Sequence, residues 1–495
     1  MISLKGFTIF VVMSPLQRYA FLTFFLINHF AFSQFFDSLV HQFVTNKHFN
    51  GANITLLAVD LSNHDTILAH NPFSAVVTAS TTKLFSTAMA LEILGPAHRF
   101  ETSLYADGNI VNGTLFGDLW IRGEGDVTLG SKFFNADGQE FNVLDEWIDS
   151  LKAHGIKKIA GKVIIDGSGY GYEGTPPGWS AWDAGNYFGA FPAGVNIYDN
   201  IVKYYFETGK PGTKAKLIQT YPKQPALNLT CKIISANVKG DDSNLQGKAY
   251  DENRIATGKL PAYKSSFMVK GSVANPELNF ASILAERMAI DSFEVSGGVH
   301  PYRNSGFTHP DYDCLNRLVV QKGRSVQEIA NWTNRKSVNF FAEGLLNGVA
   351  YKLSGSGKNS VAINIYKKFY ASRIDTTGLR LNDGSGLSRN NRISTAHFCD
   401  LLDYMTTSPM ANEFFASLPV AGINGTISDL CKGKPGDGRV YAKSGTMTGI
   451  KSYAGYVLSA SGKKIAFAFV VNGYTCSQSI VKQQMEVLLN ELALW

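Results

Sequence analysis

The sequence predicts an α+β fold in which an antiparallel sheet flanked by helices is interrupted by a long β-rich insertion. A helix and a hairpin pattern open the chain, and strand patterns and a helix close it. Many short strand-like runs broken by Gly, Pro, Asn and Asp lie between about residues 100 and 317. A sheet built from both ends of the chain must cover its apolar faces with helices, which gives the α+β class.

The composition is that of a large globular protein. The 495 residues are enough for roughly three domains, and 45% hydrophobic against 17% charged residues excludes collagen, coiled-coil and low-complexity classes. The 46 basic and 40 acidic residues give a formal charge of +6 without any Lys/Arg run. We therefore expect a generic basic surface and no nucleic-acid partner.

The N-terminal segment has the layout of an export signal. Tyr19–Phe32 is apolar, directly follows a basic residue, and ends in the small residues Ala31 and Ser33. We predict that residues 1–33 are a signal peptide cleaved after Ser33, and that the protein is exported to the periplasm or cell-wall compartment. An uncleaved anchor is the alternative, because Ile9–Val12 adds apolar length, so membrane association stays open.

The first elements of the sheet domain follow from local patterns. Phe35–Thr45 has helical apolar spacing, and Asn53–Asp60 with Thr66–Ala69 is typical of a hairpin. Lys83–Leu94 is rich in Ala, Leu and Met and is followed by Gly and Pro, which predicts an amphipathic helix that ends there.

Two segments of the insertion share a helix-then-strand pattern. They are Trp147–Ile165 and Ile283–Val299. A discontinuous domain with another domain nested between its halves would produce this pattern, and chance would produce it as readily.

The C-terminal part returns to helices and then strands. Ser325 and Glu328 form a capping-box pattern, and a second helix is expected over Val338–Ala350. The closing elements are expected at Gly449–Leu458 (strand), Ile465–Asn472 (strand) and Ser477–Leu492 (helix).

The five cysteines are widely spaced, odd in number and without a CxxC or Cys/His cluster, so no zinc or thioredoxin-type site is expected. One or two disulfides stay open in an exported protein.

The strongest chemical candidate is the SxxK motif formed by Ser80 and Lys83. A spacing of three residues places both side chains on one helix face, so they can touch. A Ser hydroxyl needs a base, and an amine can act as one when desolvation or another cation lowers its pKa. Ser461/Lys464 and Ser479/Lys482 match the same spacing, but the first lies at a hairpin tip and the second starts the terminal helix.

Two further motifs follow in order along the chain. Ser337 and Asn339 form SxN at a turn between helices, and Lys443, Ser444, Gly445 and Thr446 form KSGT at the start of a strand-rich stretch. SxN also occurs at Ser235/Asn237 and Ser388/Asn390, whereas KSG occurs once. The order SxxK, SxN, K[ST]G in these settings raises the combination above chance.

With these motifs the chain resembles the penicilloyl-serine transferases, and within them the class C penicillin-binding proteins of the D-alanyl-D-alanine carboxypeptidase/endopeptidase family. The long interval between Lys83 and Ser337 matches the two extra domains of that family. Similar segments are Gly117–Leu129, Asp383–Ser388 and Leu418–Thr426. Val338 within SxN and Ser444 in place of the commoner Thr are mild departures.

The resemblance implies a β-lactamase/transpeptidase-like domain with two inserted domains. The implied boundaries are 34–102 with 318–495 for the catalytic domain, 103–190 with 265–317 for a discontinuous second domain, and 191–264 for a nested third domain. It also implies an exported serine DD-peptidase that acts on peptidoglycan stem peptides, is acylated by β-lactam antibiotics, and needs no metal or cofactor.

The same resemblance implies a role for each motif residue. Ser80 would be the acylated nucleophile and Lys83 its base, with Ser337 as proton relay and Asn339 holding Lys83 and the substrate amide. Lys443, Ser444 and Thr446, with Gly445 between them, would bind the terminal carboxylate, and the backbone N–H groups of Ser80 and Thr446 would form the oxyanion hole. Asp383 and Ser385 either line the site or form an Asp/Gly turn.

Two other functions remain as alternatives. A serine β-lactamase needs a positioned deacylating water, and Glu343 with Asn347 superficially matches an ExxLN motif, but they follow SxN on the same helix, so we treat the match as accidental. A catalytically idle wall-binding scaffold is the other alternative, against which the presence of all three motifs argues. The histidines form no triad, because no GxSxG elbow is present.

Overall fold

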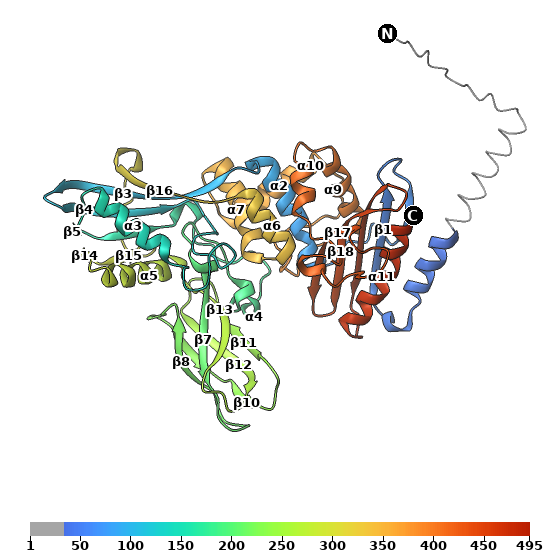
Figure 1. The fold of residues 1–495 in the computed structure, drawn as a ribbon, viewed down its shortest axis with the longest axis horizontal. Coiled ribbons are helices and arrows are strands. Elements are labelled where there is room, and N and C mark those ends of the chain that lie inside the picture. Colours follow the sequence, from blue (N-terminus) through green and yellow to red (C-terminus); the bar gives the residue numbers. More distant parts are fainter. Residues whose placement is uncertain (1–33) are drawn as a thin grey trace, which may run out of the picture.

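The structure is a computed structural model that describes residues 34–495. A helix-flanked sheet lies at one end of the elongated molecule, a second sheet lies at the other, and a small β lobe projects from between them (Figure 1). The predicted signal peptide and its cleavage site after Ser33 lie outside the described residues. Among residues 34–495, no helix combines the length and apolar character that crossing a bilayer requires.

Both ends of the chain contribute strands to the helix-flanked sheet, which is called the central sheet below. Its five antiparallel strands have the order β17-β18-β19-β1-β2. The N-terminal strand β1 pairs along its whole length with β19, from Asn53 opposite Asn472 to Asp60 opposite Ile465. The sheet thus has the composition predicted from the two chain ends. The strands are β1 Asn53–Asp60, β2 Thr66–His70, β17 Val440–Met447, β18 Ile450–Leu458 and β19 Lys464–Asn472.

Helices cover both faces of this sheet. Successive strand residues point to opposite faces, so Leu56 packs against the helix at residues 34–44 and α11, while Leu57 packs into the larger core on the other side. The predicted helix after the hairpin is present, but it is not amphipathic, because every residue from Lys83 to Leu91 is buried. The capping box of Ser325 and Glu328 is confirmed. The helices are α2 Lys83–Leu94, α6 Val326–Lys336, α7 Asn339–Ser354, α8 Asn359–Ala371, α9 Thr395–Thr407, α10 Ala411–Ser417 and α11 Gln478–Leu494.

A seven-stranded sheet forms the far end of the insertion. The helix-then-strand pattern seen in the sequence is structural, because α3 leads into β5 and β6, α5 leads into β14 and β15, and the short strands pair in parallel as β14 with β5 and β15 with β6. The elements are β3 Arg99–Val111, β4 Thr114–Gly123, α3 Asn142–Ala153, β5 Lys158–Ile159, β6 Val163–Asp166, α5 Pro276–Ile290, β14 Glu294–Val295, β15 Val299–Pro301 and β16 Asn316–Ser325.

The chain crosses between the two large lobes on paired strands. Strand β3 carries it out and β16 carries it back, in an antiparallel ladder from Asn316 opposite Ala106 to Ser325 opposite Arg99. The expected boundaries at 102 and 318 therefore fall within two hydrogen-bonded strands.

The projecting lobe has a small core of its own. A sheet of order β13-β7-β8 packs with a second sheet of β9 to β12 around buried residues that include Tyr204, Leu245 and Leu260. Its strands are β7 Ile201–Glu207, β8 Lys216–Tyr221, β9 Asn228–Cys231, β10 Ile234–Ala236, β11 Asp242–Gln246, β12 Asn253–Pro261 and β13 Phe267–Ser272. The short helix α4, Ala181–Ala184, packs against β11 at the base of this lobe (Figure 1).

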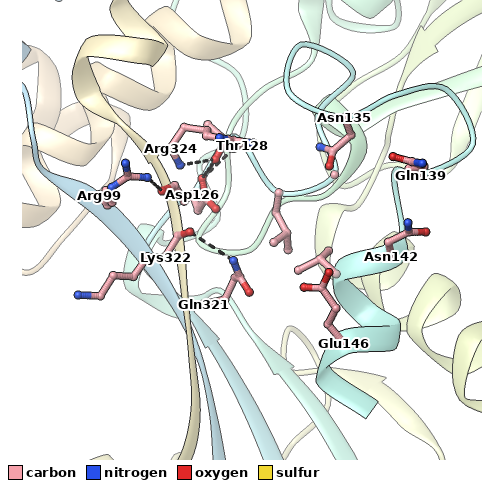
Figure 2. A pocket seen from close by; sticks show the side chains of 14 residues that line it. Arg99, Asp126, Thr128, Asn135, Gln139, Asn142, Glu146, Gln321, Lys322 and Arg324 are labelled. Atoms are coloured by element: carbon pink, nitrogen blue, oxygen red, sulfur yellow. Dashed lines mark hydrogen bonds between the residues drawn. The ribbon is translucent and has the colours of Figure 1, made fainter. Parts of the chain in front are cut away.

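A polar pocket of about 360 Å³ lies in the insertion, with side chains of β3 and β16 on one side and of α3 and its preceding loop on the other (Figure 2). The buried Asp126 lies at its base, where Oδ1 accepts hydrogen bonds from Thr128 N and Oγ1. This places the end of the segment Gly117–Leu129 in the insertion, in a pocket that none of the predicted site residues lines.

All five cysteines are free thiols. Cys399 and Cys431 are buried, and Cys314 is exposed. The disulfides that the sequence left open are therefore not formed in this structure.

Candidate active site

Ser80 and Lys83 lie together where the first helix of the sheet domain begins. Residues Ala79–Thr82 form a 3-10 turn that runs directly into α2, so Ser80 precedes the α-helix and Lys83 is its first residue. Lys83 Nζ lies 3.0 Å from Ser80 Oγ. The predicted contact is present, although a 3-10 turn produces it.

The amine of Lys83 is buried among three oxygen atoms. Besides Ser80 Oγ, it contacts Asn339 Oδ1 at 2.6 Å and the carbonyl oxygen of Ser385 at 2.7 Å. Burial lowers the pKa of Lys83 to about 7, while the charges of Asp383 and Glu343 oppose this shift. A neutral amine has two N–H groups and one lone pair. The two acceptors without protons take the N–H groups, which leaves the lone pair for the Ser80 hydroxyl.

The SxN motif occupies the turn between α6 and α7. Ser337 adopts a left-handed conformation with φ 60°, ends α6, and lets the chain reverse so that Asn339 begins α7. The Asn339 side chain bridges two parts of the chain, because Oδ1 contacts Lys83 and Nδ2 donates to the carbonyl oxygen of Phe188 at 2.9 Å. The insertion thereby helps to orient this amide.

The KSGT motif lies on β17, an edge strand of the central sheet. Lys443 Nζ donates to Ser337 Oγ at 2.9 Å and to the carbonyl oxygen of Ser444 at 2.6 Å. A Cβ on Gly445 would overlap the Ser452 hydroxyl and lie only 3.1 Å from Ser80 N. The absence of a side chain at this position therefore lets β17 approach the backbone of Ser80.

The two motif lysines influence each other. Both side chains are fully buried, and burial followed by the charge of Lys83 lowers the pKa of Lys443 well below its usual range. Two neighbouring buried amines cannot both hold a charge without a large cost, so the site favours a state with a free base. A ligand carboxylate beside Lys443 would favour its protonated form.

A cleft of about 370 Å³ opens over these groups. Four of the predicted residues line it, namely Ser80, Ser337, Asn339 and Thr446, whereas Lys83 and Lys443 lie beneath them in the protein. The inserted segment, the loop before α9 and the end of β17 with its following turn complete its walls, through Asp183, Tyr187, Phe188, Gly386, Leu387, Arg389, Met447 and Thr448.

Asp383 and Ser385 lie behind the cleft. Both are fully buried, and the Asp383 carboxylate accepts hydrogen bonds from the backbone N–H groups of Gly386 and Ser388 at 2.9 and 2.6 Å. Asp383 also accepts from Trp179 Nε1 at 2.9 Å. This is a buried turn, and its contribution to the cluster is the Ser385 carbonyl oxygen on Lys83.

The Glu343 side chain accepts hydrogen bonds from the backbone of the same turn. The two oxygens of its fully buried carboxylate accept hydrogen bonds from Gly384 N at 3.0 Å and Ser385 N at 2.7 Å. Burial, followed by the charge of Asp383, raises the pKa of Glu343 to about 8. The sequence offered Glu343 only as part of an accidental motif, and its position one turn after Asn339 on α7 was the available signal.

Sequence reasoning missed two other contacts of the KSGT strand. Thr426 Oγ1 lies 2.7 Å from Ser444 Oγ, and Lys451 Nζ donates to Thr446 Oγ1 at 3.0 Å. Thr426 belongs to the segment Leu418–Thr426 that resembles the family, whereas Lys451 pairs with Thr446 across β17 and β18, which only the strand register reveals.

The other two SxxK copies are not assembled in this way. Lys464 begins β19 and lies over the rings of Phe415 and Tyr456, and Lys482 pairs with Asp429 on the surface of the terminal helix. Among the described residues, neither amine contacts the serine of its own motif.

Curated proteins are similar to this chain over most of its length. D-alanyl-D-alanine carboxypeptidase DacB of Haemophilus influenzae is 28% identical over 448 residues, which cover 87% of this chain and 88% of the relative. D-alanyl-D-alanine carboxypeptidase of Actinomadura sp. is 26% identical, covering 86% of this chain and 78% of the relative.

A solved structure shares the fold. The crystal structure of penicillin binding protein 4 from Haemophilus influenzae superposes with a TM-score of 0.79 at 24% identity, covering 92% of this chain and 99% of that chain. The family model of the D-Ala-D-Ala carboxypeptidase 3 (S13) family matches residues 37–492, which include all three motifs and the whole insertion. The chain therefore belongs to the D-Ala-D-Ala carboxypeptidase 3 (S13) family.

Proposed function

We propose that this protein is an exported serine DD-peptidase that acts as a carboxypeptidase, an endopeptidase or both on peptidoglycan stem peptides. The observation that carries the proposal is the surroundings of Lys83 Nζ, where two proton-free acceptors and one hydroxyl leave the amine lone pair for Ser80. The family relatives named as D-alanyl-D-alanine carboxypeptidases support the substrate class.

Acylation uses the groups that meet at the cleft. Lys83 Nζ takes the proton of Ser80 as Oγ attacks the carbonyl carbon of the penultimate D-alanine. The backbone N–H groups of Ser80 and Thr446 stabilise the negative oxygen that forms. The C–N bond then breaks as Ser337 Oγ, which lies between Lys443 and the cleft, gives its proton to the leaving amine and takes one from protonated Lys443. Water then attacks the ester, its proton returns through Ser337 to Lys443, and Lys83 gives Ser80 Oγ back its proton as the peptide acid leaves.

The terminal carboxylate of the substrate is assigned to Lys443 with Ser444 and Thr446. Lys443 is buried and its pKa is lowered, so an arriving carboxylate both binds the amine and favours its protonation. Such a pairing occurs only when a carboxylate-ended ligand is present. It gives the site a preference for a free C-terminus or its β-lactam mimic.

The β-lactamase alternative is disfavoured by Glu343. Both oxygens of this carboxylate accept backbone hydrogen bonds behind the cleft, and the residue does not line it. A fully buried carboxylate engaged in this way cannot hold a water against an acyl-enzyme at Ser80.

Labelling with a fluorescent penicillin tests the proposal. The wild-type protein should form a long-lived covalent adduct, Ser80→Ala should form none, and Ser461→Ala, in the second SxxK copy, should label as the wild type does. Rapid turnover of penicillin would favour the β-lactamase, and no labelling of the wild type would favour the idle scaffold. Mass spectrometry of purified muropeptides then separates loss of one alanine from scission of cross-linked dimers.

A further inference from the structure

The positive charge of the chain is concentrated in the projecting lobe. Residues 201–272, which form β7 to β13, contain twelve basic and five acidic residues and carry a formal charge of +7. The rest of the chain contains 34 basic and 35 acidic residues, a charge of −1. The expectation of a generic basic surface was too coarse, because the lysines come from four of the seven strands and from the turns between strands, and no run of them marks the sequence.

The lysines of this basic lobe are available to an external partner. Within the described residues, the only one that has a carboxylate within salt-bridge distance is Lys223, at 3.2 Å from Glu286. Unpaired surface ammonium groups keep their attraction for an outside anion. Nine of the eleven lysines are exposed, namely Lys210, Lys214, Lys216, Lys223, Lys232, Lys239, Lys248, Lys259 and Lys264.

Like charges face each other on the sheet of this lobe. Lys203 on β7 lies directly opposite Lys270 on β13 in the antiparallel register, a pairing that destabilises a sheet. Burial lowers the pKa of nearby Lys132, Asp199 opposes that shift, and the charges of Lys270 and Lys203 lower it further. The positive charge of the lobe is therefore not balanced within its own sheet.

Apolar side chains are exposed among the lysines. Tyr263 is 73% exposed at the tip of the lobe, between Lys259 and Lys264 in the chain, where Tyr263 N donates to Gly209 O at 3.0 Å beyond the ends of β7 and β13. Ile218 and Met268 on the flanking strands are 50% and 37% exposed. Exposed apolar groups rimmed by charge indicate a partner that offers both an anion and an apolar layer.

We propose that the basic lobe docks on the surface of an anionic phospholipid bilayer, with Tyr263 and the surrounding lysines at the level of the headgroups. Lysines near an anionic leaflet each add to binding, and Tyr rings and lysine stems are favoured at the membrane interface. A hydrated polyanion would satisfy the lysines but would leave Ile218 and Met268 in water, so the bilayer accounts for more of the surface.

This contact would set the position of the cleft. The lobe runs from α4, which contributes Asp183 to the cleft wall, to a tip near β10 (Figure 1). Docking through the tip would hold the active site about one lobe length from the bilayer. The inference concerns a surface separate from the motif residues and does not depend on the peptidase activity.

Vesicle sedimentation tests the proposal with residues 34–495, which contain every described element. Vesicles of phosphatidylcholine with phosphatidylglycerol should bind the protein, and vesicles of phosphatidylcholine alone should not. The variant Lys239→Gln/Lys259→Gln/Lys264→Gln should lose about fivefold in partitioning for each lysine. Tyr263→Asn should weaken binding further, and Asn tolerates the φ of 58° at that position.

A matched control variant removes the same number of positive charges from another part of the protein. Lys367→Gln/Lys368→Gln/Lys432→Gln removes three exposed lysines outside the basic lobe, two on α8 and one in the loop before β17, and should bind vesicles as the wild type does. Equal loss in both triple variants would overturn the proposal, as would equal binding to neutral vesicles. Binding to heparin or single-stranded nucleic acid without binding to anionic vesicles would overturn it in favour of a polyanion.

Penicillin labelling of every variant gives a second measurement that is independent of vesicle binding. Unchanged labelling shows that a variant is folded, and a second triple variant, Lys210→Gln/Lys214→Gln/Lys232→Gln, replaces the first if that one fails to fold. Absence of labelling in the wild type would defeat the proposed peptidase and leave the vesicle result standing.

Discussion

Lys443 Nζ donates a hydrogen bond of 2.9 Å to Ser337 Oγ and so connects β17 to the turn between α6 and α7. The hydroxyl is held on one side by a buried amine and faces the cleft on the other. In the proposed mechanism, this hydrogen bond is the path by which a proton would reach the leaving group.

Ser337→Ala should lower the rate of acylation by a fluorescent penicillin. Loss of a positioned proton donor costs about 10²- to 10⁴-fold in rate. The melting temperature should change little, since Ala keeps the Cβ that Ser already places at this left-handed position. The second-order labelling rate constant is the measurement, and a rate equal to that of the wild type would remove Ser337 from the mechanism.

The rate of acylation should depend on the protonation of Lys83. Burial lowers its pKa to about 7, so the free base is the minor form at pH 6 and the major form at pH 8. The labelling rate should rise about tenfold per pH unit below 7 and level off above it. Lys83→Met should abolish labelling at every pH, whereas a flat wild-type profile between pH 5.5 and 8.5 would contradict the assignment of the base.

Gly445→Ala should abolish acylation through a steric effect. The new Cβ would overlap Ser452 Oγ and press on Ser80 N, which moves β17 away from the nucleophile. Gly240→Ala is the control, because a Cβ there meets nothing within 4 Å. We expect normal labelling of the control, and normal labelling of Gly445→Ala would mean that the strand can shift without harm.

Glu343→Ala should destabilise the protein and slow acylation together. It leaves two buried backbone N–H groups without acceptors, each worth about 1–3 kcal/mol, and frees the turn that places Ser385 O on Lys83. Glu343→Gln keeps one amide oxygen as acceptor and should lose less on both counts. Thermal unfolding measures the loss of stability, and the labelling rate measures the loss of acylation. If Glu343→Ala were as stable as the wild type, Glu343 would not support the turn.

Local patterns predicted what depends on local spacing. Three positions along a helical turn were enough to bring Ser80 and Lys83 into contact, and the capping box at Ser325 follows from sequence alone. The order of the motifs pointed to the long-range contacts of Lys83 with Asn339 and of Lys443 with Ser337 only through the family resemblance, since no periodicity connects residues so far apart.

The remaining contacts of the site are made by backbone atoms, which no residue type in the sequence identifies. Phe188 and Ser385 act through their carbonyl oxygens, which every residue possesses, so their identity says nothing about their place in the site. The concentration of lysines in residues 201–272 was present in the sequence but was missed, because the lysines are separated by other residues and only a count over the whole segment reveals their excess.

The pairing of β1 with β19 has a consequence for biosynthesis. About 400 residues separate these strands, and at about 5–20 residues per second a ribosome needs roughly 20 to 80 s to supply the partner. For most of that time the nascent chain carries Ser80 without β17 and its Lys443, which are made late. A hydrolase assembled in this order stays inert until its synthesis is nearly finished.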